Sequence, residues 1–313
     1  MTEIIRLQDT LSNALVRRFE KKLALAFSDV AGSTAYFSKF GDEAGRKLQQ
    51  RHLDLVQRVL PSGGGRVVDT AGDGAFLCFP TMNGAAKAMV ELLRLVAIDN
   101  DNRSSEHRLA VRVGLHFGAA LTDGTSVSGD SVNFCSRVSG SAGLAEIRLS
   151  VAAYQELSDV PLRLRCFKLK AVSLKGVPEP VDLLVLNWLD PAVFLASVRI
   201  DGAEFKLPEQ AIIRFGRLRE QDGEAANDVF LEAKDPEMSN RISRWHFELH
   251  RKPTGYILRS VSSSSTEVDG TMVPKGVEVV IRPGSRVRVG GVVTIEFLGD
   301  TRTCFPETLI PER

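Results

Sequence analysis

The sequence predicts an α+β protein built of two parts. In the first half of the chain, short apolar runs of strand type alternate with amphipathic helices in the order strand, helix, strand, strand, helix, strand. In the last third, short strand-like runs alternate with turns, which is typical of an all-β sandwich. A chain of 313 residues is long enough for each part to have its own core.

The composition excludes several classes of protein. Hydrophobic residues make up 43% of the chain, charged residues 25%, and the net charge is +1, so no global basic excess points to nucleic acid. No apolar run approaches the roughly 18 residues that a membrane span requires. The four cysteines lack the spacing of a metal site, and no secretory segment opens the chain. We therefore expect a soluble, cytoplasmic protein.

The chain opens with apolar residues at three- and four-residue steps, which predicts a helix over residues 1–22. Its apolar stripe must pack either on its own domain or on a second chain, and we expect a dimer contact. A continuous apolar run over 23–28 then predicts a buried strand that ends at Asp29. The turn that follows, 30–34, leads into a helix whose free N–H groups face the same end as this carboxylate.

A second carboxylate lies in the tight turn Gly72-Asp73-Gly74, which two strand-type runs flank. The paired strands hold the turn, so Asp73 has a fixed position, and the glycines leave room for a ligand or metal close to the backbone. A lone turn of this kind is more often an ordinary hairpin. The carboxylate turn at Asp29 favours a functional site.

A helix over 83–98 and a strand over 109–116 complete the order βαββαβ, which fits a ferredoxin-like sheet with helices on one face. A further helix that starts near Gly129 would place Asn133 and Arg137 on one face, because they are four residues apart. An amide and a guanidinium together suit phosphate or ribose oxygens. Alone, such a pair is more often a solvated helix surface.

Five motifs follow one another in this part of the chain. They are Phe27-Ser28-Asp29-Val30 with Gly32-Ser33-Thr34, Gly72-Asp73-Gly74, Gly114-Leu115-His116-Phe117-Gly118, Val132-Asn133 through Arg137, and Leu174-Lys175-Gly176. In this order they resemble the catalytic domain of class III nucleotidyl cyclases, which we expect over residues 23–188. The resemblance implies an enzyme that converts a nucleoside triphosphate to a 3′,5′-cyclic nucleotide and pyrophosphate.

The resemblance also implies roles for individual residues. Two divalent ions, Mg²⁺ or Mn²⁺, would be bound by Asp29, Asp73 and the carbonyl of Val30, one to lower the pKa of the attacking ribose hydroxyl and one to neutralise the triphosphate. Asn133 would orient the ribose, and Arg137 would stabilise charge on the α-phosphoryl group. The triphosphate would be held by the backbone N–H groups of Ala31, Gly32, Ser33 and Thr34 and by the side chain of Lys175.

In this family the metal-binding carboxylates and the Asn/Arg pair of one active site come from different subunits. A chain with one catalytic domain therefore implies a head-to-tail homodimer with two shared sites.

The family selects its base mainly at two positions, which Asp69 and Ser126 occupy here. Adenylyl cyclases usually have Lys with Asp or Thr there, and guanylyl cyclases usually have Glu with a small residue, so this sequence has neither pair. Asp69 resembles the guanine-type Glu but is one methylene shorter. From family frequency we expect ATP, then GTP, then a pyrimidine triphosphate; alternatively, Asp69 points to solvent and selects nothing.

The last third carries motifs of its own, after an expected linker at 189–198. They are Phe215-Gly216-Arg217, Asn227-Asp228-Val229, Ser243-Arg244-Trp245-His246, Ser262-Ser263 and Val268-Asp269-Gly270. They resemble a forkhead-associated (FHA) domain, which we expect over 199–300, with a tail at 301–313. Such domains bind phosphothreonine peptides.

The resemblance implies that Arg217 and Ser243 contact the phosphate, that Arg244 contacts the peptide backbone or the phosphate rim, and that His246 braces the loop. The family's Ser-Ser-Asn-Gly-Thr is replaced by Ser-Ser-Ser-Ser-Thr, so Ser264 stands where the family has a peptide-contacting Asn.

The leading hypothesis is a nucleotidyl cyclase, most simply an adenylate cyclase, that a phosphothreonine-containing partner regulates or localises. A guanylyl or pyrimidine cyclase is the first alternative. A different class is a catalytically degenerate adaptor that senses nucleotide and binds phosphopeptides. The presence of both carboxylates and of the Asn133/Arg137 pair disfavours the adaptor.

Overall fold

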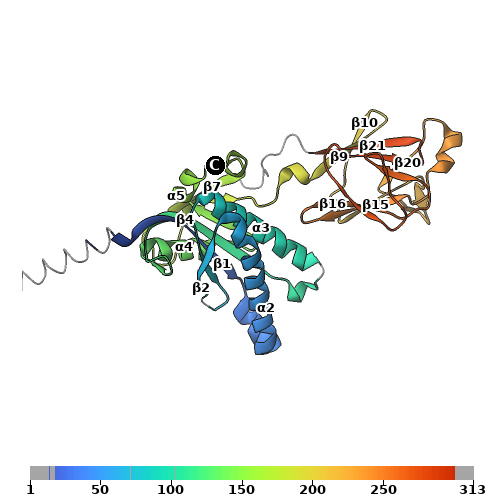
Figure 1. The fold of residues 1–313 in the computed structure, drawn as a ribbon. Coiled ribbons are helices and arrows are strands. Elements are labelled where there is room, and N and C mark those ends of the chain that lie inside the picture. The colour runs from blue at the N-terminus through green and yellow to red at the C-terminus, as the bar shows by residue number, and fades with distance from the viewer. Residues whose placement is uncertain (1–13, 15–17, 71, 102, 300–313) are drawn as a thin grey trace, which may run out of the picture. The chain divides into compact units, whose positions relative to one another are not determined.

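The computed structural model describes residues 14, 18–70, 72–101 and 103–299, and the boundary between its two compact units falls after Trp188 (Figure 1). Most of the helix predicted over 1–22 and all of the tail predicted over 301–313 lie outside the described residues. Residues 20–22, the end of that predicted helix, are instead strand: the first strand begins at Glu20, three residues before the predicted strand.

The first unit is an α+β domain built on one eight-stranded sheet. Four of its strands form the predicted ferredoxin-like core in the order β2-β3-β1-β4, with every neighbouring pair antiparallel. The elements of this core, in chain order, are β1 (Glu20–Val30), α2 (Ser33–Gly63), β2 (Arg66–Asp69), β3 (Ala75–Phe79), α3 (Met82–Asp101) and β4 (Val111–Thr122). The predicted order βαββαβ is therefore confirmed.

The sheet continues beyond β4 as β6, β8 and β7, and β5 pairs with β4 as a short hairpin. The remaining elements of this unit are η1 (Ser105–His107), β5 (Val127–Ser128), α4 (Asp130–Ser141), β6 (Ile147–Ser150), α5 (Val151–Glu156), α6 (Val160–Arg163), β7 (Cys166–Val172) and β8 (Val181–Leu186). Helix α4 is the helix predicted to start near Gly129.

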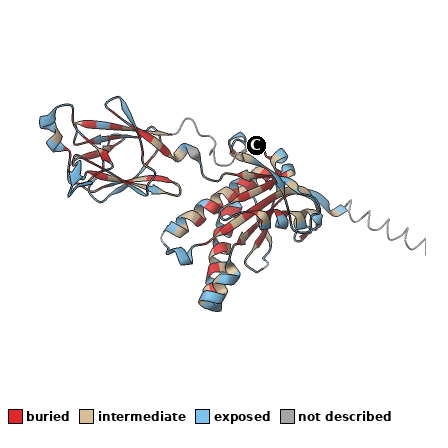
Figure 2. Ribbon diagram, turned by 180° about the vertical axis from the view of Figure 1, so that it is seen from behind, coloured by how far each residue is buried: buried red, intermediate tan, exposed pale blue. Residues whose placement is uncertain are grey.

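The central strands of this sheet are apolar on both faces, as the buried positions along them show (Figure 2). Ala24 and Ala26 of β1 face the core that α2 and α3 form, whereas Leu25 faces the opposite side, where Cys135 of α4 packs. Helices α2 and α3 thus share one face as predicted. Helix α4 covers part of the other face, because a strand that is apolar on both sides must be covered on both.

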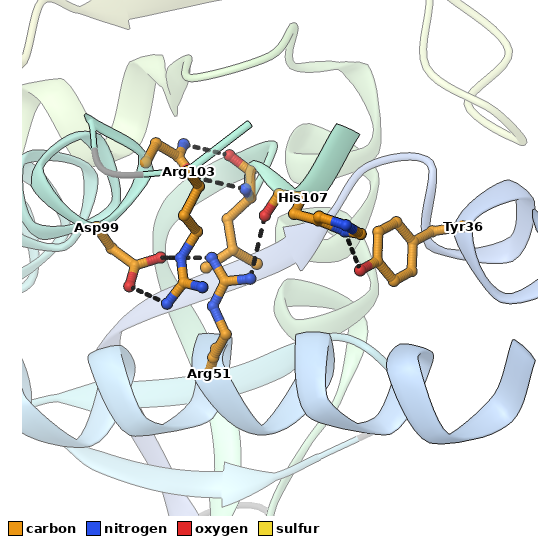
Figure 3. A network of polar contacts seen from close by, with 7 residues as sticks. Tyr36, Arg51, Asp99, Arg103 and His107 are labelled. Atoms are coloured by element: carbon orange, nitrogen blue, oxygen red, sulfur yellow. Dashed lines mark hydrogen bonds and ion pairs between the residues drawn. The ribbon is translucent and has the colours of Figure 1, made fainter. Parts of the chain in front are cut away.

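A polar network fastens α2 to the end of α3 and to η1 (Figure 3). Arg51 of α2 pairs with Asp99 of α3 and donates to the carbonyl of His107 at 3.1 Å. Arg103 donates to the two oxygens of Asp99, at 3.0 Å each. Partial burial raises the pKa of Asp99, but the two guanidinium groups outweigh it and hold this pKa below its usual value. The network thus ties α2, at Arg51, to the end of α3 and to η1.

The second unit is the predicted sandwich of two sheets, in the orders β10-β9-β21-β20-β17-β18 and β14-β11-β15-β16-β19. Its strands are β9 (Leu195–Ile200), β10 (Ala203–Lys206), β11 (Ile212–Gly216), β12 (Glu220–Gln221), β13 (Glu224–Ala225), β14 (Val229–Phe230), β15 (Phe247–Lys252), β16 (Gly255–Ser260), β17 (Thr266–Val268), β18 (Thr271–Met272), β19 (Glu278–Ile281), β20 (Arg286–Val289) and β21 (Val293–Gly299). Two short 3₁₀ helices accompany them, η2 (Pro191–Val193) and η3 (Pro236–Arg241).

The core of the sandwich includes a stacked pair, Phe215 and Phe247, with ring centroids 4.4 Å apart. Strand β9 begins at Leu195, so the last four residues of the linker predicted over 189–198 belong to the sandwich. In the part of the chain that the structure describes, no helix is both long and apolar enough to cross a membrane.

Candidate active site

A cavity of about 580 Å³ opens in the first unit, within the size range of small-molecule sites. Asp29 from the end of β1, Asp69 from β2 and Ser126 from the loop before β5 line it. Phe27 and Phe76 also line it and stack on each other, with ring centroids 4.7 Å apart. The structure therefore brings one predicted metal ligand and both predicted base-selecting residues to the same cavity.

Asp29 faces a cation that sequence reasoning missed. It is paired across the sheet with Arg112 of β4, whose Nε donates to Asp29 Oδ2 at 2.8 Å and whose Nη2 donates to the same oxygen at 2.5 Å. Arg112 also lines the cavity. The only signal in the sequence is its position inside a predicted strand, and the β1–β4 register is needed to place it beside Asp29.

Asp73 lies in the turn between β2 and β3, and its main chain is tied to a buried histidine. His52 of α2 donates from Nδ1 to the carbonyl of Asp73 at 3.1 Å, and its Nε2 lies 2.6 Å from the hydroxyl of Ser28. Burial lowers the pKa of His52 to about 4, opposed by the bond to Asp73 and by the charges of Asp29 and Asp73. The two bonds of this imidazole therefore tie the Asp73 turn to the residue that precedes Asp29.

The carboxylates of Asp29 and Asp73, with the carbonyl of Val30, offer only hard oxygen donors, the type that Mg²⁺ prefers. Mg²⁺ commonly keeps several waters and takes further oxygens from substrate phosphates, so a small set of protein donors fits this ion. Among residues 18–70, 72–101 and 103–299, no three His, Cys, Asp or Glu side chains are grouped to hold a metal.

The turn after Asp29 differs in one respect from the prediction. The N–H of Ala31 donates to the carbonyl of Ala110 at 2.7 Å, so sheet pairing removes Ala31 from the predicted set of triphosphate donors. Gly32 has a positive φ of 77° and precedes α2, which starts at Ser33. The N–H groups of Ser33 and Thr34 lie in the first helical turn, where amides lack intrahelical acceptors.

Asn133 and Arg137 lie apart from this cavity. Both are exposed on α4, whereas the cavity is lined by other residues of the same helix, including Ser136 and Ser139. Nη1 of Arg137 donates to the carbonyl of Gly176 at 3.3 Å, in the turn that also holds the exposed Lys175. Within one chain, the predicted ribose, phosphate and metal residues therefore form two separate groups.

The two base-selecting positions differ in how firmly they are held. Asp69 is exposed, and its Oδ1 accepts a bond from the N–H of Thr70 at 2.8 Å. The Ser126 main chain is fixed by Asp123, whose Oδ1 accepts from the N–H groups of Ser126 and Thr125 at 2.8 Å each. These bonds, with one from the Thr125 hydroxyl, lower the pKa of Asp123 to about 2.

The loops at one end of the sandwich bring together the predicted phosphopeptide residues. The N–H of Arg217 donates to the carbonyl of Ser243 at 3.0 Å, and the Ser243 hydroxyl lies 2.8 Å from that of Ser264 and also contacts that of Ser262. The Nε of Arg217 is buried and has no hydrogen-bond partner among the described residues. Arg244 is exposed on the same loop as Ser243.

His246 braces these loops, as predicted. It is fully buried, accepts the N–H of Ser243 at Nδ1 over 3.1 Å and donates from Nε2 to the carbonyl of Ser265 over 3.2 Å. Because Nδ1 accepts an N–H, it carries no proton and the ring is neutral; burial also lowers the pKa of His246, opposed by the bond to Ser265. One side chain thus sets the distance between two of the loops.

The fold and the site together define a two-domain protein: a ferredoxin-like domain with an acidic cavity, followed by a sandwich with a basic and hydroxyl-rich end. The adenylate and guanylate cyclase catalytic domain family matches residues 16–187, and the FHA domain family matches residues 213–290. The chain belongs to the adenylate and guanylate cyclase family and carries a C-terminal FHA domain.

Individual relatives share less than 30% sequence identity with this chain. An adenylate cyclase from Podospora anserina is 29% identical over 167 residues, which are 43% of this chain and 8% of that protein. A receptor-type adenylate cyclase from Trypanosoma congolense is 26% identical over 243 residues, 63% of this chain and 32% of that protein. The chain therefore spans less than a third of the length of either relative.

Solved structures match the first unit. The adenylate/guanylate cyclase/hydrolase from Silicibacter pomeroyi is 18% identical with a TM-score of 0.48, and the match covers 53% of this chain and 96% of that one.

Proposed function

We propose that this protein is an adenylate cyclase that forms 3′,5′-cyclic AMP and pyrophosphate at two sites, each shared between two chains. The observation that carries the proposal is the division of the site residues into two groups. Asp29, with the base-selecting positions, lines the cavity, whereas Asn133 and Arg137 face outward on α4. A head-to-tail pair of chains can bring the outward group of one chain to the cavity of the other.

The reaction is an attack of the ribose 3′-oxygen on the α-phosphorus, with pyrophosphate as the leaving group. Enzymes of this family generally use divalent metal ions, and two such ions, held by Asp29, Asp73 and the Val30 carbonyl, would supply activation of the hydroxyl and charge neutralisation. The proposed ions are Mg²⁺ or Mn²⁺.

The remaining roles in the reaction fall to N–H groups and side chains of the protein. The N–H groups of the first turn of α2 and the guanidinium of Arg112 bind triphosphate oxygens. Asn133 from the second chain orients the ribose, Arg137 stabilises charge on the α-phosphoryl oxygens, and Lys175 meets the terminal phosphates. Each of these groups lowers the activation barrier only if the dimer holds it at a fixed distance from the triphosphate.

ATP is the proposed substrate because the relatives described above are named adenylate cyclases. The cavity supports a purine through its stacked phenylalanines and through two groups able to accept an amino hydrogen, the Asp69 carboxylate and the Ser126 hydroxyl.

A four-nucleotide assay tests this choice. The purified protein is incubated with ATP, GTP, CTP or UTP and Mn²⁺, and the product is identified by mass. We expect cyclic AMP. Cyclic GMP as the main product would reassign the substrate, and a preference for UTP, which lacks an amino group on its base, would refute the role of Asp69. Nucleotide binding with no cyclic product from any of the four would refute the enzyme.

The FHA domain is proposed to bind a phosphothreonine-containing protein that regulates or localises the cyclase. Its support is the convergence of Arg217, Ser243 and Ser264 at one end of the sandwich, with a buried Nε of Arg217 whose hydrogen is unused. A guanidinium held in this way suits a phosphate dianion.

A further inference from the structure

His52 is a polar residue in the middle of an apolar helix face. It lies on α2 between Leu48 and Leu55, which pack in the main core, and it is fully buried. In the sequence it occupies a core position of an amphipathic helix, and the reaction proposed above gives it no task. A buried imidazole requires hydrogen-bond partners, and the identity of these partners is informative.

Both partners belong to the two carboxylate segments. The Asp73 carbonyl lies 3.1 Å from Nδ1, and since a carbonyl only accepts, Nδ1 must carry the proton. In the neutral ring Nε2 is then an acceptor, and it receives the hydroxyl of Ser28 over 2.6 Å. Ser28 is itself fully buried and directly precedes Asp29. One ring therefore connects the residue before one carboxylate to the main chain of the other.

The hairpin that carries Asp73 needs such a connection. Strand β2 has only four residues, and its pairing with β3 shifts register between Val67 and Asp69. Strand β1, in contrast, is paired with β4 along its whole length and with β3 from Ala24 to Ser28. Asp29 therefore lies at the end of a long paired strand, whereas Asp73 lies in a short, irregular hairpin. His52, on α2, forms a hydrogen bond to each of these two segments.

We propose that His52 is a positioning residue for the divalent-cation site: by tying the Asp73 carbonyl to Ser28, it holds the two carboxylates at the separation that a cation requires. The inference rests on the proposed function, since it assigns Asp29 and Asp73 to the metal. His52 itself touches neither substrate nor metal. Side chains that orient metal ligands in this way commonly change metal affinity or activity about 10- to 100-fold when replaced.

The test compares four variants of the full chain. His52→Leu removes both hydrogen bonds at similar volume, and His52→Asn restores an amide donor on the same side as Nδ1. The matched control is Leu55→Ala, which opens a cavity on the same buried face of α2 without touching either bond. Ser28→Ala removes one of the two bonds and serves if His52→Leu fails to fold.

Binding of Mn²⁺ is measured without nucleotide from the EPR signal of the free ion, alongside the melting temperature and the Mn²⁺ concentration that gives half-maximal cyclase activity. We expect His52→Leu to weaken Mn²⁺ binding about 10-fold or more, His52→Asn to recover part of it, and Leu55→Ala to lower the melting temperature with unchanged Mn²⁺ affinity. Ser28→Ala should shift Mn²⁺ binding in the same direction as His52→Leu.

The proposal is overturned if His52→Leu, or Ser28→Ala in its place, leaves Mn²⁺ binding unchanged, or if Leu55→Ala weakens it as much. If the wild-type chain binds Mn²⁺ but forms no cyclic nucleotide, the proposed function fails while the binding comparison still decides the role of His52.

Discussion

Mixing two inactive variants should restore activity if each site is built from two chains. Asp73→Ala removes a metal ligand, and Arg137→Ala removes a guanidinium that lies on the outward face of α4, apart from the cavity. Each single variant should lose activity by about 100-fold or more, as expected when one group that stabilises the transition state is removed. In a mixed dimer both changes fall in one site, and the second site is intact.

The size of the rescue follows from counting. Random exchange of equal amounts of the two chains makes half of the dimers mixed, and each of these has one working site of two. The expected activity is therefore about 25% of that of the wild type. The assay is cyclic nucleotide formation after the chains are coexpressed or refolded together, with mixed dimers quantified by two affinity tags.

A matched control uses two changes on the same side of the site. A mixture of Asp29→Ala with Asp73→Ala puts one defect in each site of the mixed dimer, so no rescue is expected. The reasoning would be refuted if mixed dimers of Asp73→Ala and Arg137→Ala form and stay inactive, or if the control mixture recovers to the same level.

Two further predictions concern the other parts of the molecule. Arg217→Ala should abolish binding of phosphothreonine peptides in a fluorescence-anisotropy titration, whereas Arg214→Ala, on the exposed side of β11, should not; retained binding in Arg217→Ala would contradict the phosphate role. Arg51→Ala should lower the free energy of unfolding by about 1–3 kcal/mol, because it leaves the partly buried Asp99 with one cation fewer. As a control, replacing the exposed Arg94 by alanine should change the free energy of unfolding by less than about 1 kcal/mol. The folded-state pKa of Asp99 is lowered, so the stability that Asp99 contributes is complete above the usual carboxyl pKa and is lost as pH falls through the folded value. In urea unfolding, the difference in the free energy of unfolding between wild type and Arg51→Ala should therefore be smaller at low pH. A difference that stays constant with pH would contradict the ion pair.

The sequence alone was sufficient for the order of elements in the βαββαβ unit, for the all-β second unit, and for naming most of the candidate site residues. Apolar periodicity predicted the core βαββαβ unit and the sandwich, because side-chain alternation in strands and helices is a local property. The turns at Asp29 and Asp73 and the helix that bears Asn133 and Arg137 were predicted from short-range signals of the same kind. Each of these predictions needed only the residues next to it.

What only the tertiary structure decided depends on contacts between distant segments. Arg112 meets Asp29 through the antiparallel register of β1 and β4, and the same pairing occupies the N–H of Ala31. His52 meets Ser28 and Asp73 because α2 packs its buried face against the sheet. A strand register and a helix rotation are chosen by how the whole core packs, and no local pattern contains them.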